Sequence, residues 1–259
     1  MVKYLERINK IIPIHQQVAG FNPAVNRLYP VVIAEGALLS IYDVEEGELS
    51  YRFIKDIPSP MPIPAGVRAA FPLEDYGGRI ACVVSPDIFD DPGGYVTILH
   101  EFVHCYQSES CEEMLKQKLD VANHARSQGD MMWEIQHPFP YSGVMFIRAY
   151  ERFLTALFEK QHAEIVQARQ DLMLYLGLHD FEYLVWQEWK EGFARWVENK
   201  LQKKLGLIEN LRGIEKPYSR VTFYAGGAAY IDYLNKQTPG LVNHLPYLFQ
   251  HLALPMTLN

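Results

Sequence analysis

Cysteine is scarce in this sequence, and its scarcity excludes two kinds of stabilised protein. Among 259 residues there are 3 cysteines, Cys82, Cys105 and Cys111, and no two of them form a C-x-x-C pair. They provide neither a disulfide framework nor the thiolate cage of a structural zinc site, and we expect them to be reduced thiols. A chain of this length can bury a sufficient core without such cross-links.

Positive charge and long apolar runs are also lacking. The 24 Lys and Arg residues face 31 Asp and Glu residues, which gives a net charge of −7 without a basic run. Nucleic acid is therefore not an expected partner. No apolar run approaches the roughly 18 residues that cross a bilayer, and the N-terminal stretch does not resemble a secretory signal. We predict a soluble, cytoplasmic protein without a membrane partner, whose oligomeric state the sequence leaves open.

The remaining composition is that of an ordinary globular protein, with 49% hydrophobic and 21% charged residues. Apolar residues at helical spacing predict an N-terminal helix over 1–18 that Pro13 interrupts. Short β-prone runs separated by turn residues then predict a small, mostly antiparallel sheet. These runs are 31–33, 38–42, 49–54 and 79–84.

From Tyr95 onward the pattern is mostly helical. The expected helices are 95–107, 111–127, 141–158, 160–176, 179–204, 217–236 and 244–252. The interval 127–140, which is rich in glycine and proline, is the best candidate for a crossing segment or lid. The predicted class is α+β, in a single domain over 1–259 with a β-containing lobe over 1–107 and a helical lobe over 108–259.

One motif carries recognisable chemistry. Residues 100–104 read His-Glu-Phe-Val-His, so His100, Glu101 and His104 form an HExxH pattern within a predicted helix. Spacing i, i+4 places both imidazoles on one helix face, where they can bind a single Zn²⁺. Glu101 then stands close enough to act as a general base on a metal-activated water. Apolar flanking residues favour this interpretation over a surface helix with two solvated histidines.

A zinc hydrolase needs a third protein ligand and an open position for water. The compact metzincin pattern would require glycine at 107 and histidine at 110, where this chain has Gln107 and Ser110. Acids on the predicted helix 179–204 are the next candidates, because several of them share one face: Glu188, Glu191 and Glu198. Histidines elsewhere are weaker alternatives for the third ligand: His124, His137 and His179.

The two motifs together resemble the gluzincin metallopeptidases, in which a glutamate of an E-G-[FLY]-A helix completes the site. Here that motif is Glu191-Gly192-Phe193-Ala194. The resemblance implies a zincin-like fold with the metal site between its two lobes and Glu191 as the third zinc ligand. Small residues at 192 and 194 would let this helix approach the HExxH helix closely. Glu198 either orients a ligand histidine or pairs with Arg195 along its own helix.

This sequence also departs from the gluzincin pattern. Lys190 stands where the related aminopeptidases usually have asparagine, and the strand with which they capture a free amino terminus has no counterpart. We therefore expect the metal site but not aminopeptidase specificity. Cys105, next to a predicted ligand, is expected to be a small buried apolar residue rather than a nucleophile.

Hydrolysis would also benefit from a donor aimed at the developing oxyanion. Tyr224 lies in a segment that looks like the Tyr-x-x-Gly helix of many gluzincins, and Tyr218 and Arg220 are rivals for the role. In zincins the strand before the metal helix, here 79–84, forms a sheet edge that an extended peptide can join. A central position for that strand is an equally good expectation from the residues.

The sequence therefore predicts a zinc-dependent hydrolase, most simply a peptidase with a peptide or protein substrate. In this hypothesis His100, His104 and Glu191 bind Zn²⁺, Glu101 is the general base and Tyr224 stabilises the oxyanion. Two other classes stay open: a catalytically silent zincin-like binding or regulatory protein, and a metal-free helical domain in which the pattern is accidental.

Overall fold

The computed structural model describes residues 3–45, 49–59 and 63–253. The chain divides into two compact units, residues 1–110 with 197–209 and residues 111–196 with 210–259. A sheet lies in the first unit and the second unit is helical. The predicted α+β class, with the sheet first in the sequence and helices after it, is confirmed.

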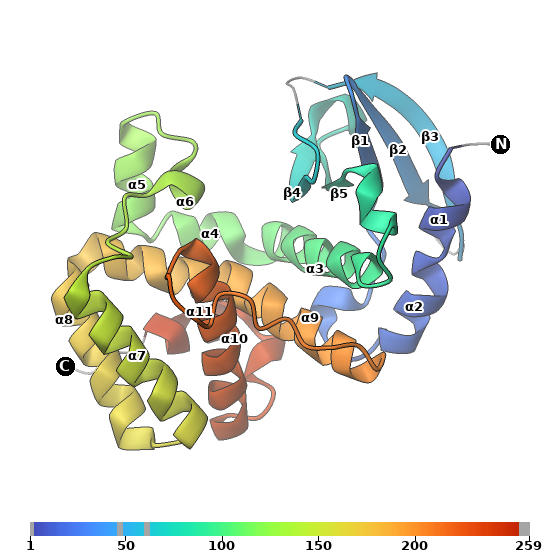
Figure 1. The fold of residues 1–259 in the computed structure, drawn as a ribbon. Helices are drawn as coiled ribbons and strands as arrows, with labels where there is room; N and C mark the ends of the chain where they lie inside the picture. Colours follow the sequence, from blue (N-terminus) through green and yellow to red (C-terminus); the bar gives the residue numbers. More distant parts are fainter. Residues whose placement is uncertain (1–2, 46–48, 60–62, 254–259) are drawn as a thin grey trace. The chain divides into compact units, whose positions relative to one another are not determined.

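The sheet of the first unit has five strands in the order β3-β2-β1-β5-β4 (Figure 1). Their bounds are β1 Val31–Glu35, β2 Leu38–Val44, β3 Tyr51–Pro58, β4 Arg68–Leu73 and β5 Arg79–Val84. Strands β1 and β5 are parallel, and the other three pairs are antiparallel. The sheet is therefore mixed and mostly antiparallel, as predicted.

Strand β4 was not predicted, and it changes the role expected of β5. Its sequence, Arg-Ala-Ala-Phe-Pro-Leu, lacks a β-branched run and contains Pro72, which is unfavourable for a strand. Because β4 pairs with one side of β5 and β1 with the other, the segment 79–84 is a central strand. Of the two expectations for this segment, the central position is confirmed, and the sheet edge that the resemblance implied is wrong.

Helix α3 (Gly94–Gln107) packs against β4 and β5, so the sheet supports the helix that carries HExxH. Its buried apolar residues include Ile98, Leu99 and Phe102. The start of the helix depends on Gly94, since a Cβ added there would lie 1.7 Å from the carbonyl oxygen of Ile88. Any side chain at this position would push α3 away from the preceding turn.

The N-terminal segment forms two helices, α1 (Leu5–Asn9) and α2 (Ile11–Val18). The break lies at Lys10, so the predicted interruption at Pro13 is wrong. Pro13 is in the first turn of α2, where a backbone N–H has no partner within the helix and proline is tolerated. The short 3₁₀ turns of this unit are η1 Pro23–Val25, η2 Glu74–Tyr76 and η3 Pro86–Phe89.

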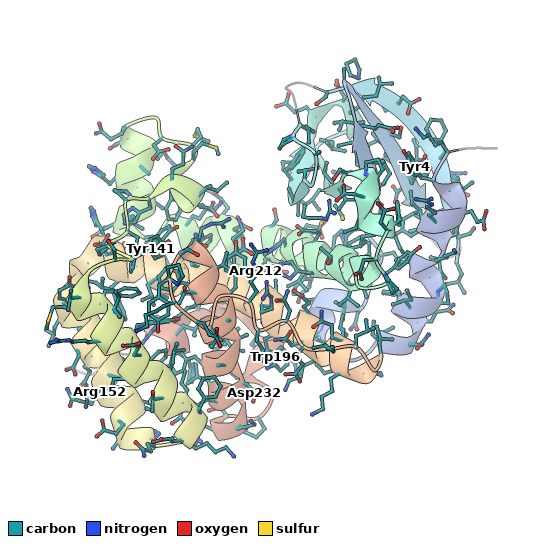
Figure 2. All side chains as sticks on the ribbon, in the orientation of Figure 1. Tyr4, Tyr141, Arg152, Trp196, Arg212 and Asp232 are labelled. Atoms are coloured by element: carbon teal, nitrogen blue, oxygen red, sulfur yellow. The ribbon has the colours of Figure 1, made fainter. Side chains whose placement is uncertain are left out.

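The second unit is built from helices that differ in detail from the predicted ones. They are α4 Glu113–Lys116, α5 Asp120–Ser127, α6 Trp133–Gln136, α7 Val144–Glu159, α8 His162–Gln187, α10 Arg220–Gln237 and α11 Leu245–Ala253, with a 3₁₀ turn, η6 Leu241–Asn243. Helices α7 and α8 form a hairpin, across which Arg152 pairs with Glu164 and Asp171 (Figure 2). The predicted break between 176 and 179 appears as a non-helical conformation of Gly177 inside α8.

Two five-residue π-helical turns interrupt the helical runs at the sites of interest. The turn η4 (Ser108–Glu112) follows α3 directly, and η5 (Glu188–Gly192) joins α8 to α9 (Phe193–Lys204). Such turns often mark functional sites in helices. Glu188 in η5 is buried and forms an ion pair with the equally buried Arg169 of α8, at 2.5 Å.

Helix α10 crosses η5 at two glycines. A Cβ on Gly192 would lie 2.8 Å from the Cα of Gly227, and a Cβ on Gly227 would lie 2.9 Å from the Cα of Glu188. Gly192 therefore serves the approach of η5 to α10. We expected Gly192 to allow an approach to the HExxH helix, and this expectation was wrong about the neighbouring helix. The sequence does not show which neighbour a small residue faces.

The segment 127–140, expected to be a crossing or lid, is anchored through α6. The backbone carbonyl of Glu134 accepts hydrogen bonds from Gln187 at 2.7 Å and Tyr183 at 3.2 Å. Its carboxylate accepts one from the indole of Trp186 at 3.1 Å and pairs with Lys190 and Lys116 at 2.9 and 2.7 Å. These contacts fix the segment to η5 and α8 within the second unit.

This anchoring predicts a pH-dependent stability. Burial raises the pKa of Glu134, but Lys190 and Lys116 outweigh burial and lower it from 4.5 to about 2. Because the pKa of Glu134 is lower in the folded protein than in the unfolded chain, its ionised carboxylate stabilises the fold at pH values above the unfolded-state pKa. This stabilisation is lost as pH falls from about 5 to 2. At neutral pH, Glu134→Gln should lower the unfolding free energy by about 3 kcal/mol in urea titrations.

The matched control is Glu164→Gln, which removes an exposed ion pair and should lower the free energy of unfolding by less than about 1 kcal/mol. The difference between wild type and Glu134→Gln should shrink as the buffer is acidified. A difference that stays constant down to the acid limit would contradict the role given to this carboxylate.

Candidate metal centre

Helix α3 presents His100 and His104 on one face, as the i, i+4 spacing predicts. Their Nε2 atoms lie 3.2 Å apart, and their ring centroids are 4.9 Å apart. Both side chains are buried, as is Glu101 between them in sequence. A buried helix segment with three titratable groups is costly unless those groups are paired or bind a cation.

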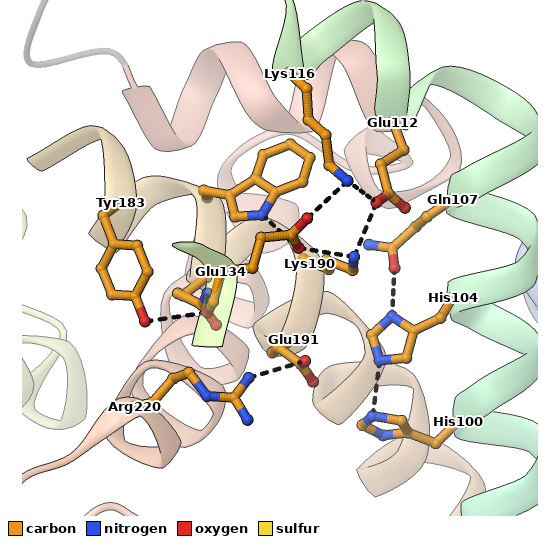
Figure 3. Close-up of polar contacts among 12 residues, drawn as sticks. His100, His104, Gln107, Glu112, Lys116, Glu134, Tyr183, Lys190, Glu191 and Arg220 are labelled. Atoms are coloured by element: carbon orange, nitrogen blue, oxygen red, sulfur yellow. Dashed lines mark hydrogen bonds and ion pairs between the residues drawn. The ribbon is translucent and has the colours of Figure 1, made fainter. Parts of the chain in front are cut away.

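The second nitrogen of each imidazole is held by another side chain. His100 Nδ1 lies 2.9 Å from a carboxylate oxygen of Glu198. His104 Nδ1 lies 2.9 Å from Oε1 of Gln107, a contact that Figure 3 shows. Both partners are oxygen acceptors, so each Nδ1 carries the proton and donates it. In the neutral tautomer this leaves a lone pair on each Nε2, and the two lone pairs face one another across 3.2 Å.

Two facing lone pairs repel unless a proton or a cation lies between them. Two imidazole nitrogens bound to one tetrahedral Zn²⁺ at about 2.0–2.1 Å are about 3.3 Å apart. The observed 3.2 Å separation of the Nε2 atoms matches that value. The donor set, its spacing and the fixed tautomers therefore fit a metal ion that takes imidazole ligands.

The partners of the two histidines were foreseen to different degrees. Glu198 contacts a candidate ligand histidine, as one of its two interpretations expected, and Arg195 donates to the carbonyl of Asn210 at 3.1 Å. Gln107 was missed as a functional residue. It lies three positions after His104, on the same helix face, so this spacing could have indicated the contact.

Glu191 lies in η5 of the second unit, and its carboxylate is 3.5 Å from Nη1 of Arg220 on α10 (Figure 3). The guanidinium of Arg220 in turn stands 5.3 Å from the ring centre of Tyr224, and that of Arg195 stands 5.7 Å from it. The structure thus groups Glu191 with two of the three predicted oxyanion donors.

Tyr218, the third of these donors, is placed differently. Its ring packs against Phe146 and Tyr150, with centroids 6.1 and 5.7 Å apart, and burial raises its pKa. This is a packing environment. Of the three predicted donors, Arg220 is thus the one in contact with Glu191, and Tyr224 lies beside Arg220.

The weaker candidates have other partners. His137 pairs with Asp180 at 2.6 Å and stacks on Tyr183. His124 and His179 contact each other through their rings, 5.5 Å apart. Cys105 is fully buried, and burial raises the pKa of its thiol well above the usual value, which agrees with a core residue and not a nucleophile. All three cysteines are unpaired.

Comparison of the chain with protein-family models, with curated proteins and with solved structures gave no match. Within the described residues, no helix combines the length and apolarity needed to cross a membrane.

The hydrogen bond from His104 to Gln107 predicts a spectroscopic change. In ¹⁵N-edited NMR spectra of chelator-treated wild type in alkaline buffer, His104 should carry its proton on Nδ1. Gln107→Leu removes the acceptor, so the Nε2–H tautomer of His104 should appear. His100, which keeps Glu198, is the internal control, and an unchanged His104 signal would show that Gln107 does not fix the tautomer.

Proposed function

We propose that this protein is a zinc-dependent hydrolase, a peptidase of the gluzincin type with a zincin-like fold, in which His100, His104 and Glu191 bind the metal. The observation that carries the proposal is the pair of facing Nε2 atoms 3.2 Å apart, each on a ring whose Nδ1 is held. Neutral imidazoles oriented in this way are the usual protein ligands of Zn²⁺.

Glu191 as the third ligand rests on two supports. Glu191 precedes Glu198, the partner of His100, by seven residues on a helical run, which is about two turns and returns to the same face. The E-G-F-A motif that begins at Glu191 is the family pattern for this ligand.

The chemistry follows from the residues around the histidines. A metal bound there would supply an electrophilic centre that activates water and polarises a carbonyl. Glu101, next to His100 on α3, accepts a proton from the attacking water and passes it to the leaving amine. Tyr224 or Arg220 donates to the oxyanion that develops on the substrate. Peptide bonds as the substrate class rest on the gluzincin resemblance, and a cytoplasmic location stays a prediction.

The proposal predicts one zinc ion per chain in protein purified without added metal. Glu101→Gln should keep the zinc and lower the hydrolysis of a peptide library by about 10²-fold or more, because it removes only the base. Glu191→Ala should lose zinc affinity as well as activity. Glu113→Gln, which removes an exposed acid paired with Arg126, is the control and should change neither quantity.

The outcomes separate the competing classes. Bound zinc without hydrolysis of any library peptide, in wild type and variants alike, would identify a catalytically silent binding protein. Protein that contains no transition metal and takes up none would leave the HExxH pattern without function. Equal hydrolysis by wild type and Glu101→Gln would exclude the mechanism.

A further inference from the structure

A half-buried cluster of two lysines and two glutamates includes Lys190, the residue before Glu191. Lys190 Nζ is 2.8 Å from Glu112 and 2.9 Å from Glu134. Lys116 Nζ contacts the same two carboxylates, at 2.8 and 2.7 Å. Figure 3 shows these four side chains and the ion pairs that join them.

The cluster joins two segments that are far apart in the sequence. Glu112 closes η4, the turn that continues directly from α3, and lies eight residues after His104. Lys190 is in η5, immediately before Glu191. The ion pair between them spans 78 residues of chain. It therefore connects the turn that continues the HExxH helix to the turn that carries the third candidate ligand.

Electrostatic attraction restricts the movement of this connection. The ammonium groups of Lys190 and Lys116 each contact the carboxylates of both Glu112 and Glu134, so each positive charge has two negative partners. Both ammonium groups also stand over the ring of Trp186, at 5.5 Å for Lys116 and 5.9 Å for Lys190. A charge held by two carboxylates in a half-buried site has few alternative positions, because each would leave a group unpaired.

We propose that Lys190 is a positioning residue for the metal centre: its ion pairs with Glu112 and Glu134 hold the turn of Glu191 in register with the segment that follows the two histidines. This inference rests on the proposed function, because it concerns the proposed third ligand. It assigns a role to the lysine that replaces the asparagine usual in the related aminopeptidases.

Lys116 offers a closely matched control. It contacts the same two carboxylates and the same indole ring, but it lies on α4 and is not adjacent to Glu191. Replacing either lysine by methionine removes one charge from the same cluster and keeps most of the apolar stem. A purely structural cluster would respond similarly to both changes.

The experiment compares zinc affinity with thermal stability in the full chain. Zinc affinity is measured by competition with a chromophoric chelator, and Tm by circular dichroism. Lys190→Met should weaken zinc binding about tenfold or more, within the range expected when residues that orient metal ligands are changed. Lys116→Met should lower Tm to a similar extent and change zinc affinity less than about threefold.

A milder variant keeps the test decisive if Lys190→Met folds poorly. Glu112→Gln leaves Lys190 paired with Glu134 and should also weaken zinc binding. When Lys190→Met is added to Glu112→Gln, the further loss of zinc affinity should be smaller than the loss that Lys190→Met causes in the wild type. Equal losses of zinc affinity in the Lys190 and Lys116 variants, or wild-type affinity in Lys190→Met and Glu112→Gln, would overturn the positioning role alone. A wild-type chain without zinc affinity would instead overturn the proposed function, and the positioning role with it.

Discussion

The contact on which the candidate centre depends is the approach of two imidazole nitrogens, His100 Nε2 and His104 Nε2, to 3.2 Å. Hydrogen bonds to Glu198 and Gln107 hold both rings with their unprotonated nitrogens facing each other. Such an arrangement is unfavourable without a positive charge between the nitrogens. A proton between the two nitrogens meets this requirement as well as a cation does, so the choice of a metal rests on the function that we propose.

The two histidines are held by chemically different partners. A carboxylate on the Nδ1–H of His100 makes that imidazole a stronger electron donor, whereas the neutral amide of Gln107 mainly fixes the orientation of His104. Glu198 also adds a negative charge to a site that contains Glu101, so a divalent cation would be balanced within a few residues. Gln107 lies on the same helix as His104, whereas Glu198 comes from a segment 98 residues away from His100.

Local features were predictable from the sequence, whereas pairings between distant segments were not, apart from the contact of Glu198 with a histidine. The helix with His100 and His104 on one face follows from spacing alone, and so does most of the sheet. Strand β4 could not be foreseen, because its residues have no β pattern and only its pairing with β5 makes it a strand. Gln107 was within reach at i+3, whereas the pairing of Lys190 with Glu112 depends on how 78 residues of chain fold back.

The turn η5 shows how one short segment serves several requirements at once. Consecutive residues of a helix point about 100° apart, so neighbours in sequence face different surroundings. Lys190 reaches the acidic cluster, Glu191 faces Arg220, and Gly192 meets α10 at Gly227. The lysine and the glycine take up the electrostatic and packing roles, so the backbone of Glu191 is held on both sides while its carboxylate contacts Arg220. This division of roles is what the ligand role that we propose for Glu191 would require.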